Sequence, residues 1–203
     1  MDEHEVMNDQ YGSWADTAPN VPHSTECSWN DELVDQDCID SSTRIQQGAD
    51  YPATCVDQCV AQEYCASVGK ELCQSDRVWV ADANRDDWYS ACSNQGETTY
   101  PQGNRPDEDV CNVQETGEGA SWEVDVGTQC VNEQGVRDLI GNVWEWVGGA
   151  TACGRTRDAG DECMARGASF AEQVERCTCD EVFSPLRGDT ADNLGFRCCW
   201  YPG

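Results

Sequence analysis

The sequence has 203 residues, enough for one domain with its own core, and it carries 39 acidic against 12 basic residues for a formal net charge of −27. A surface this negative repels phosphate backbones and anionic lipid headgroups, so nucleic acid partners and membrane insertion are not expected. Apolar residues make up only 38%, yet eight Trp, six Tyr and three Phe predict a core built on aromatic side chains.

Fifteen cysteines are scattered along the chain. Zinc sites use closely spaced Cys and His, but CxxC is absent, CxC occurs once and there are only two His. Disulfides in an exported protein are therefore favoured. Because the number is odd, at least one thiol is unpaired, bridged between chains or used chemically, and the spacing leaves the connectivity open.

The first thirty residues lack the basic and then apolar pattern of a signal peptide, and no run approaches the roughly 18 apolar residues of a membrane span. We therefore expect a secreted, periplasmic or cell-surface protein whose export signal is missing from this sequence or lies upstream of it.

The first predicted elements are a short strand and a helix within residues 1–20, with Tyr11 among the apolar points of the helix. Residues 21–54 are acidic and rich in turn formers, without a clear period. They are expected to form a loop that Cys27 and Cys38 tie down.

A helix is predicted from Asp57 onwards, in DQCVAQEYCASVGK. Val60, Tyr64 and Val68 recur every four residues, which is typical of an amphipathic helix. Asp57 can cap its N-terminus, and Gly69 can end it in a left-handed turn.

A second helix is predicted in NRDDWYSACS, residues 84–93, with Asn84 as its cap and Trp88 and Cys92 facing inward. After residue 95, Gly, Asn, Asp, Pro and Thr dominate, which predicts loops with short strands.

The segment GVRDLIGNVWEWV, residues 135–147, has the apolar alternation of a strand with one aromatic face. Gly141 indicates a bend at the start of that strand.

Several segments together resemble the formylglycine-generating enzyme family, also called sulfatase-modifying factors. They occur in the family's order over nearly the whole chain: EVMNDQY at 5–11, PATCVDQCVAQEYCASVGKEL at 52–72, DDWYSAC at 86–92, YPQGN at 100–104, CN at 111–112, VGTQCVNEQGVRDLIGNVWEW at 126–146, RGASF at 166–170 and NLGFRC at 193–198. The resemblance implies an irregular α+β fold related to the C-type lectin domain, with two main helices and short antiparallel strands. It also implies one domain over residues 1–203 that lacks the family's first strand.

The resemblance implies calcium, which binds six to eight oxygens. Carried over by position, Asp138 and Glu145 would supply carboxylates, and Gly141 and Val143 would supply carbonyls. The alternative is that Glu145 points to solvent between two core tryptophans. Arg197 matches a buried family arginine that pairs with a core carboxylate or with carbonyls.

A second family calcium site uses an asparagine matching Asn112 and the carbonyl of Val113, together with oxygens from a segment that is shortened in this chain. Asn112 could equally be a turn residue that hydrogen-bonds its own backbone.

Active members of the family hold copper(I) between two thiolates and use oxygen to convert a cysteine of a sulfatase into formylglycine. The two ligand positions lie two and seven residues after the aromatic residue of RGASF, and here they are Glu172 and Cys177. A carboxylate is a poor donor for soft copper(I), which puts oxidase activity in doubt. Cys179 could supply a second sulfur only after a backbone rearrangement.

We therefore expect a calcium-bound, disulfide-stabilised, non-catalytic module that binds an unidentified protein or small ligand. The alternative is a copper-dependent oxidase that acts on a target sulfatase. A related iron-dependent enzyme would need three histidines, and the two present cannot supply them.

Overall fold

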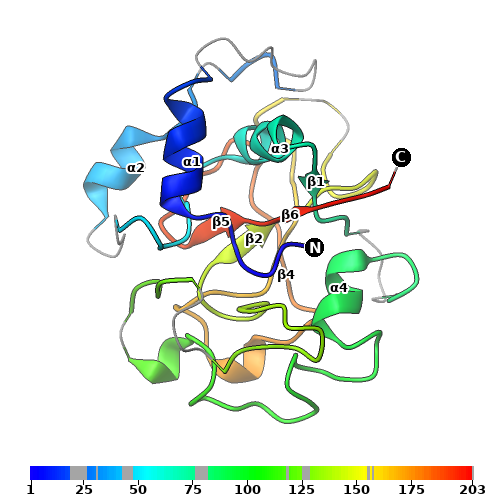
Figure 1. The fold of residues 1–203 in the computed structure, drawn as a ribbon. Coiled ribbons are helices and arrows are strands. Elements are labelled where there is room, and N and C mark those ends of the chain that lie inside the picture. The colour runs from blue at the N-terminus through cyan, green and yellow to red at the C-terminus, as the bar shows by residue number, and fades with distance from the viewer. Residues whose placement is uncertain are drawn as a thin grey trace.

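The structure is a computed structural model that describes residues 1–18, 27–30, 32–42, 48–75, 82–117, 119–124, 129–154, 156 and 158–202. Within these residues the chain forms four α-helices, two short 3-10 helices and six short strands. The mixed α+β class is confirmed, with four α-helices where two main ones were expected. Figure 1 shows α1, α2 and α3 gathered on one side of the central strands, and irregular segments from the middle of the chain on the other.

The N-terminal helix is found where it was expected. α1 (Asn8–Ala15) follows an extended segment in which Val6 donates its N–H to the carbonyl of Phe196, and Tyr11 is its buried residue. The loop predicted over residues 21–54 is wrong in part, because α2 (Gln36–Ser41) forms there. α2 contains no buried residue, so no apolar period could have revealed it.

The helix predicted from Asp57 is confirmed as α3 (Gln58–Ser67). The carboxylate of Asp57 accepts the N–H of Val60 at 2.9 Å, and Gly69 has the expected positive φ of 74°. Val68 is 48% exposed, so the apolar stripe ends one turn earlier than the period indicated.

The second predicted helix is confirmed as α4 (Asp87–Cys92), with Trp88 and Cys92 buried. Its cap is Asp86 and not Asn84, because the carboxylate of Asp86 accepts the N–H of Tyr89 at 2.8 Å.

Two small sheets form the middle of the molecule. In the larger sheet β2 (Trp144–Trp146) pairs in parallel with β5 (Leu194–Phe196) and antiparallel with β3 (Ala165–Arg166), and β3 pairs antiparallel with the edge strand β4 (Val182–Phe183). The parallel pair departs from the antiparallel strands that were expected.

The smaller sheet is the antiparallel pair β1 (Glu71–Leu72) and β6 (Cys198–Cys199). The 3-10 helices η1 (Gln114–Thr116) and η2 (Val174–Arg176) lie in the irregular half of the chain.

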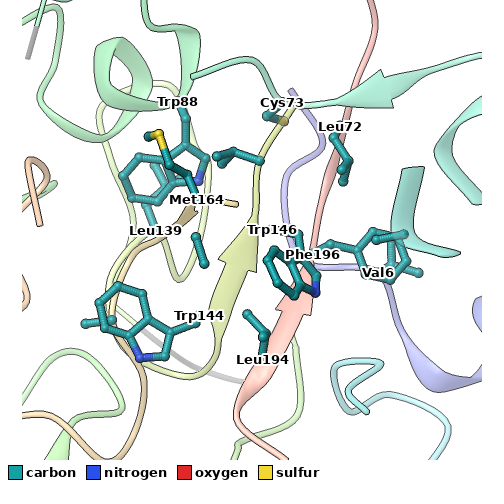
Figure 2. Close-up of a cluster of buried hydrophobic side chains, with 14 of the residues drawn as sticks. Val6, Leu72, Cys73, Trp88, Leu139, Trp144, Trp146, Met164, Leu194 and Phe196 are labelled. Atoms are coloured by element: carbon teal, nitrogen blue, oxygen red, sulfur yellow. The ribbon is translucent and has the colours of Figure 1, made fainter. Parts of the chain in front are cut away.

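The core is built on aromatic residues, as the composition predicts. Trp88, Trp146 and Phe196 are among the largest fully buried side chains. Figure 2 shows Trp146 and Phe196 close together on one side of β2, and Trp88 on the other. The strand predicted in residues 135–147 is confirmed only over Trp144–Trp146, and all three of these residues are buried, so neither face reaches solvent.

Fourteen of the fifteen cysteines form disulfides, which confirms the predicted framework. The bridges are Cys27–Cys59, Cys38–Cys55, Cys65–Cys198, Cys73–Cys199, Cys92–Cys179, Cys111–Cys130 and Cys153–Cys163. The single free cysteine is Cys177, which is buried. Seven disulfides in a chain of 203 residues fit an oxidising compartment.

None of the helices in the described part of the chain has the length and apolar character needed to cross a membrane.

Candidate functional site

Glu145 lies at the centre of a buried polar cluster. It is the middle residue of β2 and accepts hydrogen bonds from Arg197 on both oxygens: from Nε at 2.9 and 2.8 Å, and from Nη2 at 2.6 Å. Trp88 Nε1 donates to Oε2 at 2.9 Å. Each oxygen therefore accepts two hydrogen bonds, which occupies its lone pairs. The alternative in which Glu145 points to solvent is wrong, since the residue is 1% exposed.

Arg197 is fully buried, and the core carboxylate and carbonyls expected for it are both present. Its guanidinium also donates to four backbone carbonyls, those of Asp2, Glu3, Arg137 and Asp138. Burial lowers the pKa of Arg197, but the charge and hydrogen bonds of Glu145, together with the nearby acids Glu5 and Asp138, outweigh burial and raise the pKa above its ordinary value. Arg197 therefore stays charged and holds the N-terminal segment and the loop before β2 against β5.

Glu5 is a second buried carboxylate beside the same arginine. Its Oε1 accepts Asn142 Nδ2 at 2.9 Å, and its Oε2 lies 4.0 Å from Arg197 Nη2 and accepts no hydrogen bond among the described residues. Burial, followed by the negative charge of Asp138, raises the pKa of Glu5 to about 8, although Arg197 acts in the opposite direction. Glu5 is therefore protonated at neutral pH.

The four residues predicted to hold calcium, Asp138, Gly141, Val143 and Glu145, are all buried. Gly141 has a φ of 75°, and a side chain there would collide with the backbone of Asn112. The bend predicted at this glycine is thus required by a close backbone approach.

The carboxylate of Glu145 is already occupied by hydrogen bonds from Arg197 and Trp88. Calcium bound by Glu145 would have to displace one of these donors, whereas calcium held by Asp138 and nearby carbonyls would leave the ion pair in place. In the described ranges no three His, Cys, Asp or Glu side chains are grouped as a metal site. Calcium binding at this segment stays a prediction.

Asn112 and Val113, predicted for a second calcium site, lie in a hydrogen-bonded loop. Asn112 Nδ2 donates to the carbonyl of Ala120 at 3.0 Å and to Asn142 Oδ1 at 3.2 Å. The carbonyl of Val113 accepts the hydroxyl of Thr116 at 2.6 Å. The amide of Asn112 thus joins separate segments, and calcium at this second position also stays a prediction.

The positions that match the family's copper ligands hold one thiol and one carboxylate. Cys177 Sγ lies 3.3 Å from the carbonyl of Gln173 and 3.9 Å from that of Glu172. Burial, followed by the charge of Glu172, raises the pKa of the Cys177 thiol to about 12. A thiol with this pKa is protonated at neutral pH and is a poor nucleophile and metal ligand.

No second thiol is available to Cys177, because the other fourteen cysteines are paired in disulfides. Cys179, the sequence-level candidate, is wrong for this role because it forms a disulfide with Cys92. The carboxylate of Glu172 is held by Ser169, which donates its N–H at 2.8 Å and its hydroxyl at 2.6 Å to Oε2. A two-thiolate copper(I) site does not fit these residues.

Sequence reasoning missed a second buried ion pair. Arg166 of β3 donates to Asp86, the cap of α4, at 2.7 Å, and Ser75 donates to the same carboxylate oxygen at 2.6 Å. Arg166 and Asp86 each open a segment that resembles the family, but nothing in their spacing shows that they meet.

Comparisons with known proteins show which family and fold the chain resembles. Residues 1–202 match a family described as the sulfatase-modifying factor enzyme 1-like domain. The chain is 27% identical over 168 residues to the inactive C-alpha-formylglycine-generating enzyme 2 of Bos taurus, which covers 76% of this chain and 52% of that protein. The chain thus spans about half the length of this curated relative.

Solved structures with a similar fold share little sequence with the chain. CarF has a TM-score of 0.60 at 17% identity, covering 96% of this chain and 82% of its own. The Treponema denticola variable protein 1 has a TM-score of 0.58 at 15% identity, covering 96% and 81%. PvdO from Pseudomonas aeruginosa has a TM-score of 0.56 at 22% identity, covering 76% and 64%. At these identities the likeness shows the fold alone.

Proposed function

Because this chain belongs to the sulfatase-modifying factor enzyme 1-like family, we propose that it is a non-catalytic member that works as a disulfide-stabilised binding or structural module in an oxidising, extracellular type of compartment. The observation that carries this proposal is the pairing of Cys92 with Cys179, which leaves Cys177 as the one free cysteine. Soft copper(I) needs a pair of thiolates for the family's oxidation, and a single protonated thiol beside carboxylates cannot provide one.

Two further points support the proposal. The relative from Bos taurus bears a name that calls it inactive. Lectin-like folds, to which we also assign this chain, carry variable loops on a rigid base, and seven disulfides supply rigidity to a chain with few long elements. The proposed module binds an unidentified protein or small ligand, and neither nucleic acid nor a membrane core.

Calcium is part of the proposed function. The residues that would hold it are Asp138 and the carbonyls of Gly141 and Val143, with Glu145 left to Arg197. When bound, calcium would supply positive charge to a buried region that contains three acidic side chains, Glu5, Asp138 and Glu145, and one guanidinium.

The alternative is a copper-dependent oxidase that converts a cysteine of a target sulfatase. A competition titration with a chromogenic copper(I) chelator, run beside oxygen uptake with a cysteine-containing sulfatase peptide, separates the two. We expect no stoichiometric copper(I) binding, no oxygen uptake above buffer and no change on Cys177→Ser. One equivalent of copper(I), lost in Cys177→Ser, would overturn the proposal.

A further inference from the structure

We propose that a pocket between the segment before α2 and the N-terminal end of α3 binds an organic cation, an ammonium or guanidinium group on an alkyl stem such as a lysine or arginine side chain presents. The inference rests on the proposed role as a binding module and gives that module a ligand class. Figure 1 shows α2 and α3 on the helical side of the molecule, with α1 between them in this view.

The pocket has a volume of about 350 Å³, and disulfides fix its walls. Cys55 lines the pocket and is bridged to Cys38 of α2, while the wall that contains Trp29 begins at Cys27, which is bridged to Cys59 of α3. The hydroxyl of Tyr11 donates to the carbonyl of Leu33 in the same wall. A ligand would therefore enter a site that is already formed, with little ordering cost.

The charge of the pocket has one sign. Among the residues that the structure describes, Glu32, Asp35 and Asp57 line the pocket, and no Lys or Arg does. Hydrogen bonds from Thr190 and from the N–H of Cys38 hold the pKa of Asp35 below its usual range, so this carboxylate is charged at neutral pH. The net charge of −27 adds a field that concentrates cations and repels anions.

The pocket also offers a surface for the uncharged part of such a ligand. Trp29 is half-buried, and the edge of its ring lies against Gly188. A Cβ added to Gly188 would lie 3.4 Å from this ring. Val34 and Val60 line the pocket as apolar neighbours of an alkyl stem. A cation near a tryptophan face gains about 0.5–2 kcal/mol, so the same walls complement the head and the stem.

Two other pockets of similar size have mixed charge. One contains Arg187, Lys70 and Glu71, and another contains Lys70 with the acids of the N-terminal segment. Charge complementarity therefore favours the pocket of Trp29 as the site for a cation.

Titration calorimetry of the oxidised protein tests the proposal. The probes are Nα-acetyl-lysine methylamide, its arginine counterpart and spermidine, and the neutral comparators are the Nε-acetylated lysine derivative and the norleucine derivative. We expect dissociation constants near the millimolar range for the cations and binding at least about fivefold weaker for both neutral compounds. Raising the salt from about 20 to about 200 mM should weaken only the cations.

Variants assign the signal to the pocket. Asp35→Asn keeps an oxygen that can cap α2 but removes the charge, and Trp29→Leu keeps an apolar side chain beside Gly188. Each should weaken cation binding at least about threefold, while Glu133→Gln, an exposed acid outside the pocket, should bind like the wild type. Circular dichroism checks that each variant is folded.

The probes also distinguish the source of the cation. Tighter binding of spermidine than of the amino-acid derivatives would indicate a free polyamine, and the reverse order would indicate a side chain of a partner protein. Equal binding of norleucine and lysine derivatives, wild-type affinity in Asp35→Asn and Trp29→Leu, or no heat with any cation would each overturn the inference. The copper and oxygen measurements do not depend on this pocket, so its failure is separable from failure of the proposed function.

Discussion

Glu145 and Arg197, 52 residues apart in the chain, form a buried ion pair in which both carboxylate oxygens contact the guanidinium at 2.6–2.9 Å. The pair joins β2 to the end of β5, strands that also pair in parallel. Because the arginine also holds backbone carbonyls near the N-terminus and before β2, one side chain connects three distant parts of the chain.

Removal of this arginine should destabilise the protein strongly. Arg197→Met leaves Glu145 buried without its counter-charge, a change that costs about 3–5 kcal/mol in buried pairs. The free energy of unfolding from guanidinium chloride titration of the oxidised protein measures the cost. The matched control is Arg176→Met, because Arg176 is 69% exposed and pairs with Glu181 only at 3.5 Å. That change should cost about 0–1 kcal/mol. Similar costs for the two variants would contradict the assigned role of the buried pair.

Stability should fall as pH rises, because of Glu5. Its folded pKa of about 8 lies above the ordinary value of 4.5, so the folded state holds a proton that the unfolded state releases. The stability that this proton provides is fully present below pH 4.5 and is lost as pH rises through 8. Denaturant midpoints measured from pH 5 to 9 test this slope.

Glu5→Gln should flatten that pH dependence. The glutamine is neutral at every pH and keeps an oxygen that can accept the amide of Asn142. Its denaturant midpoint should therefore exceed that of the wild type at pH 9. Parallel profiles for Glu5→Gln and the wild type would assign the slope to other groups.

Two disulfides at the C-terminus should contribute non-additively. Cys65–Cys198 and Cys73–Cys199 close loops of 133 and 126 residues, and their cysteines are adjacent at one end. With either bridge intact, the other closes only the short segment between Cys65 and Cys73, so losing one bridge should cost about 2.5 kcal/mol. Losing both opens the larger loop, which the intact Cys92–Cys179 bridge shortens, and should cost about 6–7 kcal/mol, more than the sum of the two.

The measurement uses Cys→Ala pairs at each bridge and at both, compared by denaturant titration. A useful control is removal of Cys153–Cys163, whose separation is only 10 residues, with an expected cost of about 3 kcal/mol that adds to that of either single removal. If the costs of removing Cys65–Cys198 and Cys73–Cys199 were strictly additive, the two bridges would not share one loop constraint on the unfolded chain.

The elements that the sequence predicted well are those whose signals are local. α3 has apolar residues that recur every four positions, and it begins at Asp57, whose carboxylate accepts the N–H of Val60 three residues later. α2 also begins at a capping aspartate, Asp35, but it has no buried residue and therefore no apolar period to detect. The bridge from Cys38 to Cys55 ties it to the segment before α3. Local propensity alone cannot reveal a helix that distant contacts hold in place.

The pairing of distant residues was predictable only in part. Resemblance to the family indicated that Arg197 would be buried with a carboxylate, but Glu145 was assigned to calcium. The parallel pairing of β2 with β5 brings these two residues together, and a sequence pattern does not specify which strands pair across 50 residues. For the same reason, the sequence did not show that Arg166 pairs with Asp86, 80 residues away.

The thiol of Cys177 should be unreactive in the folded protein. It is buried, and its pKa of about 12 leaves almost no thiolate below pH 9. Ellman's reagent should detect no thiol at pH 8 without denaturant and one equivalent in guanidinium chloride. Cys177→Ala should remove that equivalent and leave seven disulfides by mass spectrometry. Rapid labelling of the native protein would contradict the burial of this thiol, and more than one equivalent would contradict the disulfide assignment.

Calcium should stabilise the protein through Asp138. If the ion binds there, saturating calcium stabilises by a few kcal/mol and raises the melting temperature by about 5–10 °C. Any salt raises the melting temperature of a protein with a net charge of −27 by screening its self-repulsion. The melting temperature in magnesium at the same concentration is therefore the baseline for the effect of calcium. Asp138→Asn preserves shape and tolerates the left-handed φ of 52° at this position, and it should respond equally to both ions. Glu133→Gln, an exposed change, should retain the calcium-specific rise. A wild-type response that is the same for calcium and magnesium would leave Asp138 as a purely structural acid beside Arg197.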